Sequence, residues 1–369
     1  MNRQIGAIKL PVDRLHLELT NICNFSCEFC PDSKMKRKKG MMSIEMARSI
    51  IDDAARSRAV RLLLFHVMGE PSLHPRLTDI VQYATEKGIK TCLTTNGSRL
   101  DENLLQELVT AGIGEIIISL QTPDEKTFSY RGAKGLTFDD YSERIVSIAK
   151  YFLPGLCSTR LTVSFLSSPL RRLIIPIFPE VSIADRTADL KKYLMSWYEK
   201  ITPLPPPNNG GIKGGVLNDP DVQKQLKKIW TFKENIINIS SHLQFHTRVM
   251  GDWSVHFDKK NINAVFGYCP GIQENFGILW NGEYTFCCTD FDGRTSSYNF
   301  SDTSITDYLK KEVVQDVVKG FNRLRVVHPY CKQCLGDRNI LNALVKQTGS
   351  IAYFKWWRNG SGKTVSIKE

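Results

Sequence analysis

The chain has 369 residues, of which 42% are hydrophobic and 24% charged, a composition that excludes a disordered chain and indicates a globular protein with a large core. Lys and Arg outnumber Asp and Glu by 49 to 38, and the resulting formal charge of +11 suits an anionic partner. The apolar stretches are too short for a transmembrane helix, and the first residues, MNRQIGAIKLPVDRL, hold no apolar signal core, so we expect a cytoplasmic protein.

Strand-like and helix-like segments alternate through the first half of the chain. The alternation is typical of βαβ units around a parallel sheet, and five or six units are enough for a partial barrel or an open wound sheet. Asp101 is expected to cap one helix and Gly88 to end another. The predicted strands are 14–20, 61–67, 89–95, 115–120, 160–166 and 200–204, and the predicted helices are 43–57, 76–88, 101–112, 138–152 and 188–199.

Four predicted strands in succession end in polar or glycine-containing segments. LELT leads into a cysteine cluster, LFHV into MGEP, CLTT into NGS and IISL into QTP. Ligands gather at the carboxyl ends of parallel strands, so we expect an active site at this rim.

The second half divides into three parts. The Pro- and Gly-rich stretch PLPPPNNGGIKGG (203–215) begins a linker or insertion, 206–264, for which the sequence indicates a helix and two strands but no role. A cysteine-bearing unit follows at 265–340. The remainder, 341–369, is predicted to be a C-terminal helix with a basic tail, and lying on a membrane surface is the alternative.

Ten cysteines are present, and eight of them form two groups near opposite ends of the chain. Clustered cysteines in a reducing compartment are metal ligands more often than disulfides. Cys92 and Cys157 stand alone, and each is expected to be a small core residue.

The first group, Cys23, Cys27 and Cys30, has the spacing C-x3-C-x2-C. Three thiolates can bind three irons of a [4Fe–4S] cluster, which leaves the fourth iron open to a ligand that is not protein. The alternative is a zinc site completed by a distant residue such as His66 or His74.

The first cysteine group and four later motifs together resemble the radical SAM superfamily. The four motifs are MGEP at 68–71, TTNG at 94–97, SLQT at 119–122 and YRG at 130–132, and within the cysteine group Phe29 stands directly before the last cysteine. The resemblance covers roughly 10–205 and implies a partial (β/α)6 barrel of the radical SAM type. Met68 departs from the family's more usual glycine.

The resemblance also implies the cofactors and their residues. The open iron would bind S-adenosylmethionine, the reduced cluster would cleave it, and a 5′-deoxyadenosyl radical would abstract hydrogen from the substrate. The cluster ligands implied are Cys23, Cys27 and Cys30, and the implied S-adenosylmethionine site comprises Phe29, Gly69, Glu70, Thr95, Asn96, Ser119 and Gln121.

The second group has five cysteines, and four of them, Cys269, Cys287, Cys331 and Cys334, follow the pattern C-x12-G-x4-C and then C-x2-C. Taken alone, it also fits a structural zinc ribbon. The pattern resembles the SPASM/twitch extension of radical SAM enzymes, a small α+β domain, and implies one auxiliary [4Fe–4S] cluster. Cys288 lies outside this pattern, and three roles are open for it. It binds the cluster in place of Cys287, it donates a hydrogen atom to the substrate, or it is simply a buried residue.

Together these features predict an oxidoreductase that abstracts hydrogen from a small polar molecule such as a sugar, cyclitol or aminoglycoside precursor. The auxiliary cluster would accept an electron during dehydrogenation, as in the cyclitol dehydrogenase that the spacing resembles. The expected reductant is an acidic flavodoxin or ferredoxin. No catalytic residue or general base is assigned.

Three alternatives remain open. One is a peptide-modifying enzyme, disfavoured because no peptide-binding segment precedes the first strand. Another is a radical epimerase, which needs a hydrogen donor such as Cys92, Cys157 or Cys288. The third is a zinc-dependent nucleic-acid-binding module, suggested by the KMKRKK run at 34–39 but disfavoured because no aromatic residue interleaves with it.

Overall fold

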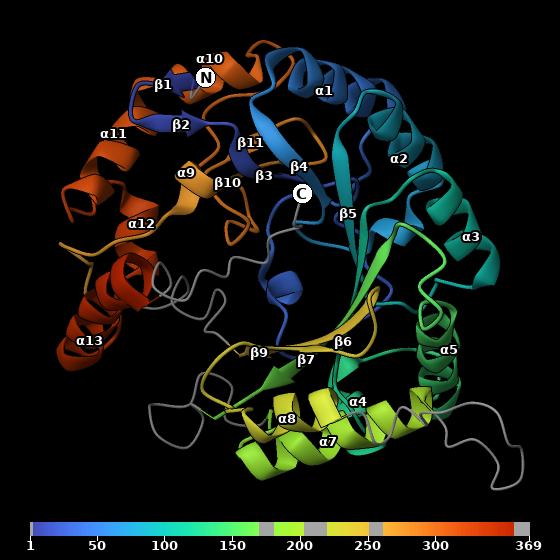
Figure 1. Cartoon of the computed structure of the whole chain (residues 1–369). Coiled ribbons are helices and arrows are strands. Elements are labelled where there is room, and N and C mark those ends of the chain that lie inside the picture. The colour runs from blue at the N-terminus through green and yellow to red at the C-terminus, as the bar shows by residue number, and fades with distance from the viewer. Residues whose placement is uncertain (1–2, 170–180, 203–219, 251–260, 358–369) are drawn as a thin grey trace, which may run out of the picture. The chain divides into compact units, whose positions relative to one another are not determined.

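The computed structural model describes residues 3–169, 181–202, 220–250 and 261–357 of the chain (Figure 1). They form two compact units. Unit 1 comprises Met1–Glu18, Lys34–Leu63 and Asp252–Glu369, and unit 2 comprises Leu19–Ser33 and Leu64–Gly251. Strand β4 (Val60–Phe65) runs from one unit into the other.

The sheet of unit 2 has the strand order β5-β6-β7-β9-β8. Neighbouring strands are parallel except for β8, which pairs antiparallel with β9 at the edge. The central strands are buried and rich in Ile, Val and Leu, as parallel strands covered on both faces are. Their bounds are β5 Lys90–Thr95, β6 Glu115–Gln121, β7 Arg160–Ser167, β8 Asn235–Asn238 and β9 Leu243–Val249.

The helices of unit 2 follow the sequence pattern closely. Asp101 accepts a hydrogen bond from the Leu104 amide at the start of α3, and Gly88 follows α2 with φ +73°, so both predicted helix ends are confirmed. Helices α2, α3 and α5 lie along the outer side of the strands (Figure 1). The bounds are α2 Leu77–Glu86, α3 Glu102–Thr110, α4 Glu125–Phe128, α5 Phe138–Tyr151, α7 Thr187–Ile201 and α8 Pro220–Lys227, with short 3-10 turns η1 Pro31–Lys34, η2 Pro71–Leu73 and η3 Ser129–Arg131.

The predicted strand at 200–204 is wrong. Lys200 and Ile201 belong to α7, and 203–204 lie outside the described residues. Ile201 continues the buried stripe of Leu190, Leu194 and Trp197, so the helical period overrides the β propensity of Ile and Thr. The strand that pairs in parallel with β7 is instead β9, from the 206–264 region.

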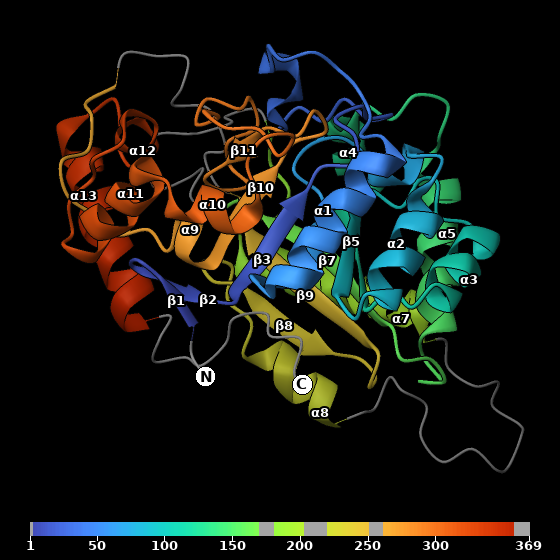
Figure 2. The same ribbon diagram turned by 90° about the horizontal axis from the view of Figure 1, so that it is seen from above.

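Unit 1 combines a parallel strand pair with a group of helices. β10 pairs in parallel with β3 and antiparallel with β11, while β1 and β2 form a hairpin. Figure 2 shows α11, α12 and α13 grouped together. The bounds are β1 Arg3–Ile5, β2 Ile8–Leu10, β3 Val12–Leu17, α1 Ile44–Ser57, α9 Gly271–Glu274, β10 Asn275–Ile278, β11 Tyr284–Thr285, α10 Ile305–Lys310, α11 Glu312–Asn322, α12 Pro329–Cys334, α13 Ile340–Ile351 and η6 Ala352–Trp357.

The predicted C-terminal helix is α13, which belongs to unit 1 and packs within it. Its buried Gln347 accepts hydrogen bonds from the amides of Val265 and Phe266, and Ser350 accepts one from the Tyr268 amide. The helix thus holds the backbone that leads to Cys269. No helix among the described residues is long and apolar enough to cross a membrane, and the tail at 358–369 lies outside them.

Candidate functional site

The first cysteine group lies in a loop of unit 2 that is fastened to the YRG segment. The Ser26 amide donates to the Arg131 carbonyl (3.1 Å) and the Glu28 amide to the Tyr130 carbonyl (2.9 Å). The loop also turns on itself, because the Cys30 amide donates to the Cys27 carbonyl (3.0 Å). These backbone bonds fix the path of the loop.

The three cysteines of this loop are half-buried, and their thiols share one poorly hydrated environment. Burial raises the pKa of Cys23 to about 11 and that of Cys30 to about 12, and it also raises the pKa of Cys27. The thiols raise one another's pKa as well, because two thiolates repel. Bound iron would supply the positive charge that deprotonates them.

The thiols are not gathered around one point. Among the residues that the structure describes, no three His, Cys, Asp or Glu side chains are arranged to hold a single metal ion. An iron–sulfur cluster takes one thiolate at each of several irons, so it does not require such convergence. The donor set of buried, neighbouring thiols fits a cluster.

Arg131 lies beside these thiols, although it was not among the predicted site residues. Its side chain is 1% exposed, its guanidinium lies 5.0 Å from the ring centre of Phe25 and 5.9 Å from that of Phe29, and its Nη1 donates to Gln121 Oε1 (2.5 Å). The buried Nε has no hydrogen-bond partner in the described part of the chain. A buried cation with a spare donor requires an anion nearby.

Gly69 brings the MGEP segment against the backbone that precedes the cysteines. It adopts φ +76°, and a Cβ atom there would lie 2.4 Å from the Thr20 carbonyl oxygen and 2.7 Å from Asn21 Cα. The Glu70 amide donates to the Ile22 carbonyl (2.8 Å). Only glycine allows this approach, so the residue fixes Glu70 beside the loop.

Glycine at this position can be tested by comparison with Gly88, which has φ +73° but no atom within 4 Å of a built Cβ. Gly69→Ala should lower the free energy of unfolding by roughly 2–5 kcal/mol, through both strain and collision with backbone. Gly88→Ala should cost only about 1 kcal/mol. Chemical denaturation measures both, and equal losses would show that the contact with Thr20 and Asn21 is unimportant.

The Glu70 carboxylate is buried, 1% exposed, and held by three donors. Thr95 Oγ1 donates to Oε1 (2.7 Å), as does the Ser72 amide (3.0 Å), and the Asn96 amide donates to Oε2 (2.6 Å). None of these recorded partners is a cation. The carboxylate therefore presents a fixed negative charge suited to an ammonium group.

Asn96 links the TTNG segment to the cysteine loop. Its Nδ2 donates to Asn24 Oδ1 (2.9 Å) and lies 4.0 Å from Cys23 Sγ, while its carbonyl accepts from the Tyr141 hydroxyl (2.7 Å). Cys23, Glu70, Thr95 and Asn96 are thus brought together.

The remaining predicted residues come from β6 and the loop. Gln121 has φ +60° at an irregularity in the β6–β7 register, an unusual backbone that aims its side chain at Arg131. Ser119 lies on the same strand and is half-buried. Phe29 packs against Val181 and Ile183. Every residue predicted for this site lies in unit 2.

The second cysteine group lies in unit 1. Cys269 precedes α9, Cys287 follows β11, and Cys331 and Cys334 are three positions apart on α12, on one side of the helix. Burial raises the pKa of Cys269 to about 12, with Cys334 the next cause, and it also raises the pKa values of Cys287 and Cys331 well above their ordinary value. These four thiols therefore interact with one another in one half-buried group.

Cys288 belongs to the same environment. It raises the pKa of both Cys269 and Cys287, so it lies near both thiols. All three roles predicted for it remain open. By contrast, Cys92 is 1% exposed on β5 and is a core residue, as expected, whereas Cys157 is half-buried.

Two protein families match the chain. A family described as the radical SAM superfamily matches residues 17–165, and SPASM, described as an iron–sulfur cluster-binding domain, matches 269–335. The "Tungsten-containing aldehyde ferredoxin oxidoreductase cofactor-modifying protein" of Pyrococcus furiosus is 32% identical over 106 residues, which cover 29% of this chain and 30% of that protein. The chain spans about a third of the length of the curated relatives that it matches first.

Solved structures resemble the fold over most of the chain. Streptococcus suis SuiB bound to the precursor peptide SuiA has a TM-score of 0.53 at 16% identity, covering 86% of this chain and 68% of SuiB. The structure of native anSMEcpe with bound AdoMet has a TM-score of 0.52 at 14% identity, covering 95% of this chain and 99% of anSMEcpe. At these identities the likeness concerns the fold alone, and it confirms the predicted α/β partial barrel.

Proposed function

Because the chain belongs to the radical SAM superfamily and carries a C-terminal SPASM iron–sulfur domain, we propose that this radical SAM enzyme dehydrogenates a small polar molecule such as a sugar or cyclitol. The observation that carries the proposal is the contrast between two half-buried cysteine groups. One has three thiols beside a fixed carboxylate and a buried arginine, and the other has four thiols. The zinc-dependent module is no longer an alternative.

The residues of unit 2 fit a cluster together with S-adenosylmethionine. Cys23, Cys27 and Cys30 would hold the cluster, whose fourth iron would remain available. Bound there, the two cofactors would supply one-electron hydrogen-abstraction chemistry. The other residues orient and shield them.

Glu70 would bind the amino group of S-adenosylmethionine. Its orientation is set in advance by Thr95, Ser72 and the Asn96 amide, so little side-chain freedom is lost on binding. Its burial strengthens the attraction for a cation, since water screens it poorly.

Arg131 would bind an anionic group in the same site. Its spare Nε–H and its position among Cys27, Phe25 and Gln121 suit either a thiolate of the cluster or the carboxylate of S-adenosylmethionine. Phe29, Ser119 and Gln121 would complete the site around these groups.

The four-thiol group would serve electron transfer. With Cys269, Cys287, Cys331 and Cys334 as ligands, every iron of an auxiliary cluster is bound by protein, so it has no free position for substrate. Dehydrogenation of a carbinol carbon releases one hydrogen atom, one proton and one electron, and the last needs an acceptor. An auxiliary cluster held by these four thiols would accept that electron.

The test uses anaerobically reconstituted protein, reductant, S-adenosylmethionine and a panel of sugars and cyclitols deuterated at the carbinol carbons. We expect one deuterium in 5′-deoxyadenosine and one carbonyl product for each 5′-deoxyadenosine formed. No 5′-deoxyadenosine above background with any polyol would contradict the substrate class. Turnover of a peptide instead would favour peptide modification, and an inverted alcohol would favour epimerisation.

A further inference from the structure

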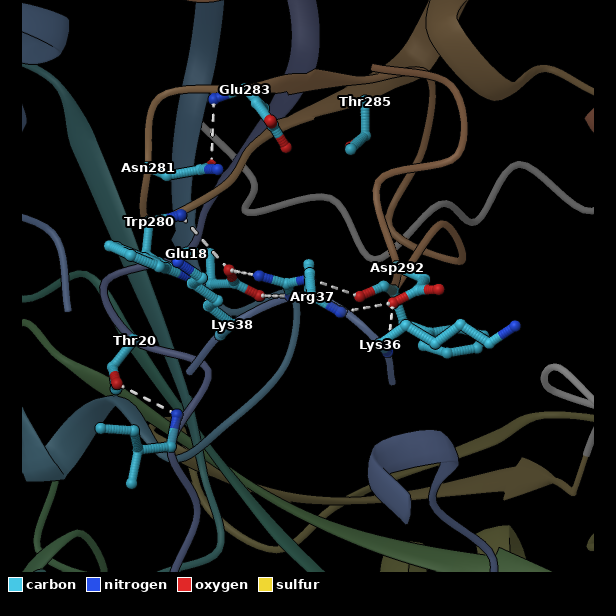
Figure 3. A network of polar contacts seen from close by, with 12 residues as sticks. Glu18, Thr20, Lys36, Arg37, Lys38, Trp280, Asn281, Glu283, Thr285 and Asp292 are labelled. Atoms are coloured by element: carbon cyan, nitrogen blue, oxygen red, sulfur yellow. Dashed lines mark hydrogen bonds and ion pairs between the residues drawn. The ribbon is translucent and has the colours of Figure 1, made fainter. Parts of the chain in front are cut away.

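The basic run at residues 34–40 is a surface loop of unit 1 whose backbone is held firmly in place (Figure 3). Asp292 Oδ1 accepts hydrogen bonds from the amides of Lys36 (2.6 Å) and Arg37 (3.1 Å). The Trp280 indole Nε1 donates to the Lys38 carbonyl (3.2 Å). Gly40 packs so closely on the Trp280 ring that a Cβ atom would lie 2.5 Å from it.

One side chain of the run turns inward. Arg37 forms a two-pronged ion pair with Glu18, whose carboxylate also accepts from the Trp280 amide (3.2 Å), and Arg37 Nε donates to the Phe291 carbonyl (2.7 Å) (Figure 3). The side chains of Arg37 and Glu18 are 11% and 0% exposed. The arginine therefore anchors the loop and contributes little charge to its surface.

The lysines of the run are on the outside. Lys34, Lys36, Lys38 and Lys39 are all exposed. A cationic surface on a fixed backbone binds an acidic partner without first being ordered.

We propose that residues 34–40 form a docking surface for an acidic protein electron donor. The inference rests on the proposed function, which requires an external one-electron donor. Lys34 follows Cys30 by four residues, and four residues of chain span at most about 14 Å. The run therefore begins within that length of chain from Cys30, a proposed ligand of the cluster that would take the electron.

The lysine surface suits a protein better than a nucleic acid. No aromatic side chain in 34–40 offers a face for base stacking, and the Trp280 indole is occupied by Gly40 and the Lys38 carbonyl. Charge complementarity chiefly accelerates the encounter of two proteins. The contribution of these lysines to the rate of reduction by the donor should therefore weaken as the salt concentration rises.

The test compares K36E/K38E/K39E with K224E/K227E/K228E, which makes the same charge change on exposed lysines in and directly after α8. The readout is substrate-free cleavage of S-adenosylmethionine, driven either by reduced flavodoxin or by photoreduced deazaflavin. With flavodoxin at about 50 mM salt, the cleavage rate of K36E/K38E/K39E should be about 10-fold or more below that of the wild type, and the difference should be smaller at about 300 mM salt. With deazaflavin, its cleavage rate should fall by no more than about 2-fold. Its affinity for flavodoxin should fall by a similar factor.

The α8 variant should retain wild-type rates with both reductants. Equal losses with both reductants, no loss with either, an equal loss in the α8 variant, or tighter binding of a short DNA duplex than of flavodoxin would each overturn the proposal. Because no substrate is used, a wrong substrate class leaves this test intact. Failure of the wild type to cleave S-adenosylmethionine with deazaflavin would instead contradict the proposed function.

Discussion

Alanine in place of Cys30 is expected to reduce 5′-deoxyadenosine formation to the background of protein-free buffer. The loop would retain two thiols, too few to hold a cluster with a single open iron. Iron analysis after anaerobic reconstitution should fall from about eight to about four irons per chain, since the thiols of unit 1 are untouched.

The reciprocal change separates the two cysteine groups. Cys334→Ala should also lose about four irons, yet it should still cleave S-adenosylmethionine while forming no carbonyl product. Cys92→Ala, at a buried cysteine outside both groups, serves as the control and should keep its iron. Full activity of Cys30→Ala, or loss of both clusters in either single variant, would contradict the assignment of the two ligand sets.

Arg37→Met is expected to destabilise unit 1 by about 3–5 kcal/mol, because it removes the two-pronged ion pair from the fully buried Glu18 carboxylate. Methionine keeps much of the arginine's apolar length but supplies no charge or hydrogen bond. Chemical denaturation, followed by the fluorescence of Trp280 and the other tryptophans, gives the change in the free energy of unfolding.

Two further variants make this prediction specific. Glu18→Gln combined with Arg37→Met should recover most of the loss, because the amide oxygen still accepts from the Trp280 amide and no charge remains buried. Arg76→Met breaks an ion pair whose side chains are 53% and 44% exposed, and should cost less than about 1 kcal/mol. Equal costs for Arg37→Met and Arg76→Met would show that burial of Glu18 is not decisive.

The fold class could be predicted because each βα unit is encoded locally. A strand of five to seven residues, a capped helix such as the one after Asp101 and a glycine such as Gly88 are all readable within a short window. The exception was the last parallel strand, since β9 is separated from β7 by α7, α8 and the antiparallel β8. The β-branched residues Ile201 and Thr202 led instead to the wrong prediction of a strand at 200–204.

The candidate site was predicted in part for a similar reason. Its cysteines, Gly69 and Glu70 occur in short motifs at strand ends, which the sequence displays directly. Arg131 was missed, although the YRG tripeptide was noticed, because its role depends on contacts with Phe25 and Phe29 about 100 positions earlier. The link from Arg37 to Asp292 spans 255 positions and leaves no local signal.

The late arrival of β9 has a consequence for synthesis on the ribosome. Gln244 on β9 bonds Thr162 on β7 across 82 positions, so β7 has an open, apolar edge until that stretch has been made. At ordinary translation rates this wait lasts roughly 4–16 s, long enough for unpaired edges to meet. A chain ended after residue 205 would keep that edge permanently and should accumulate as aggregates unless a chaperone covers it.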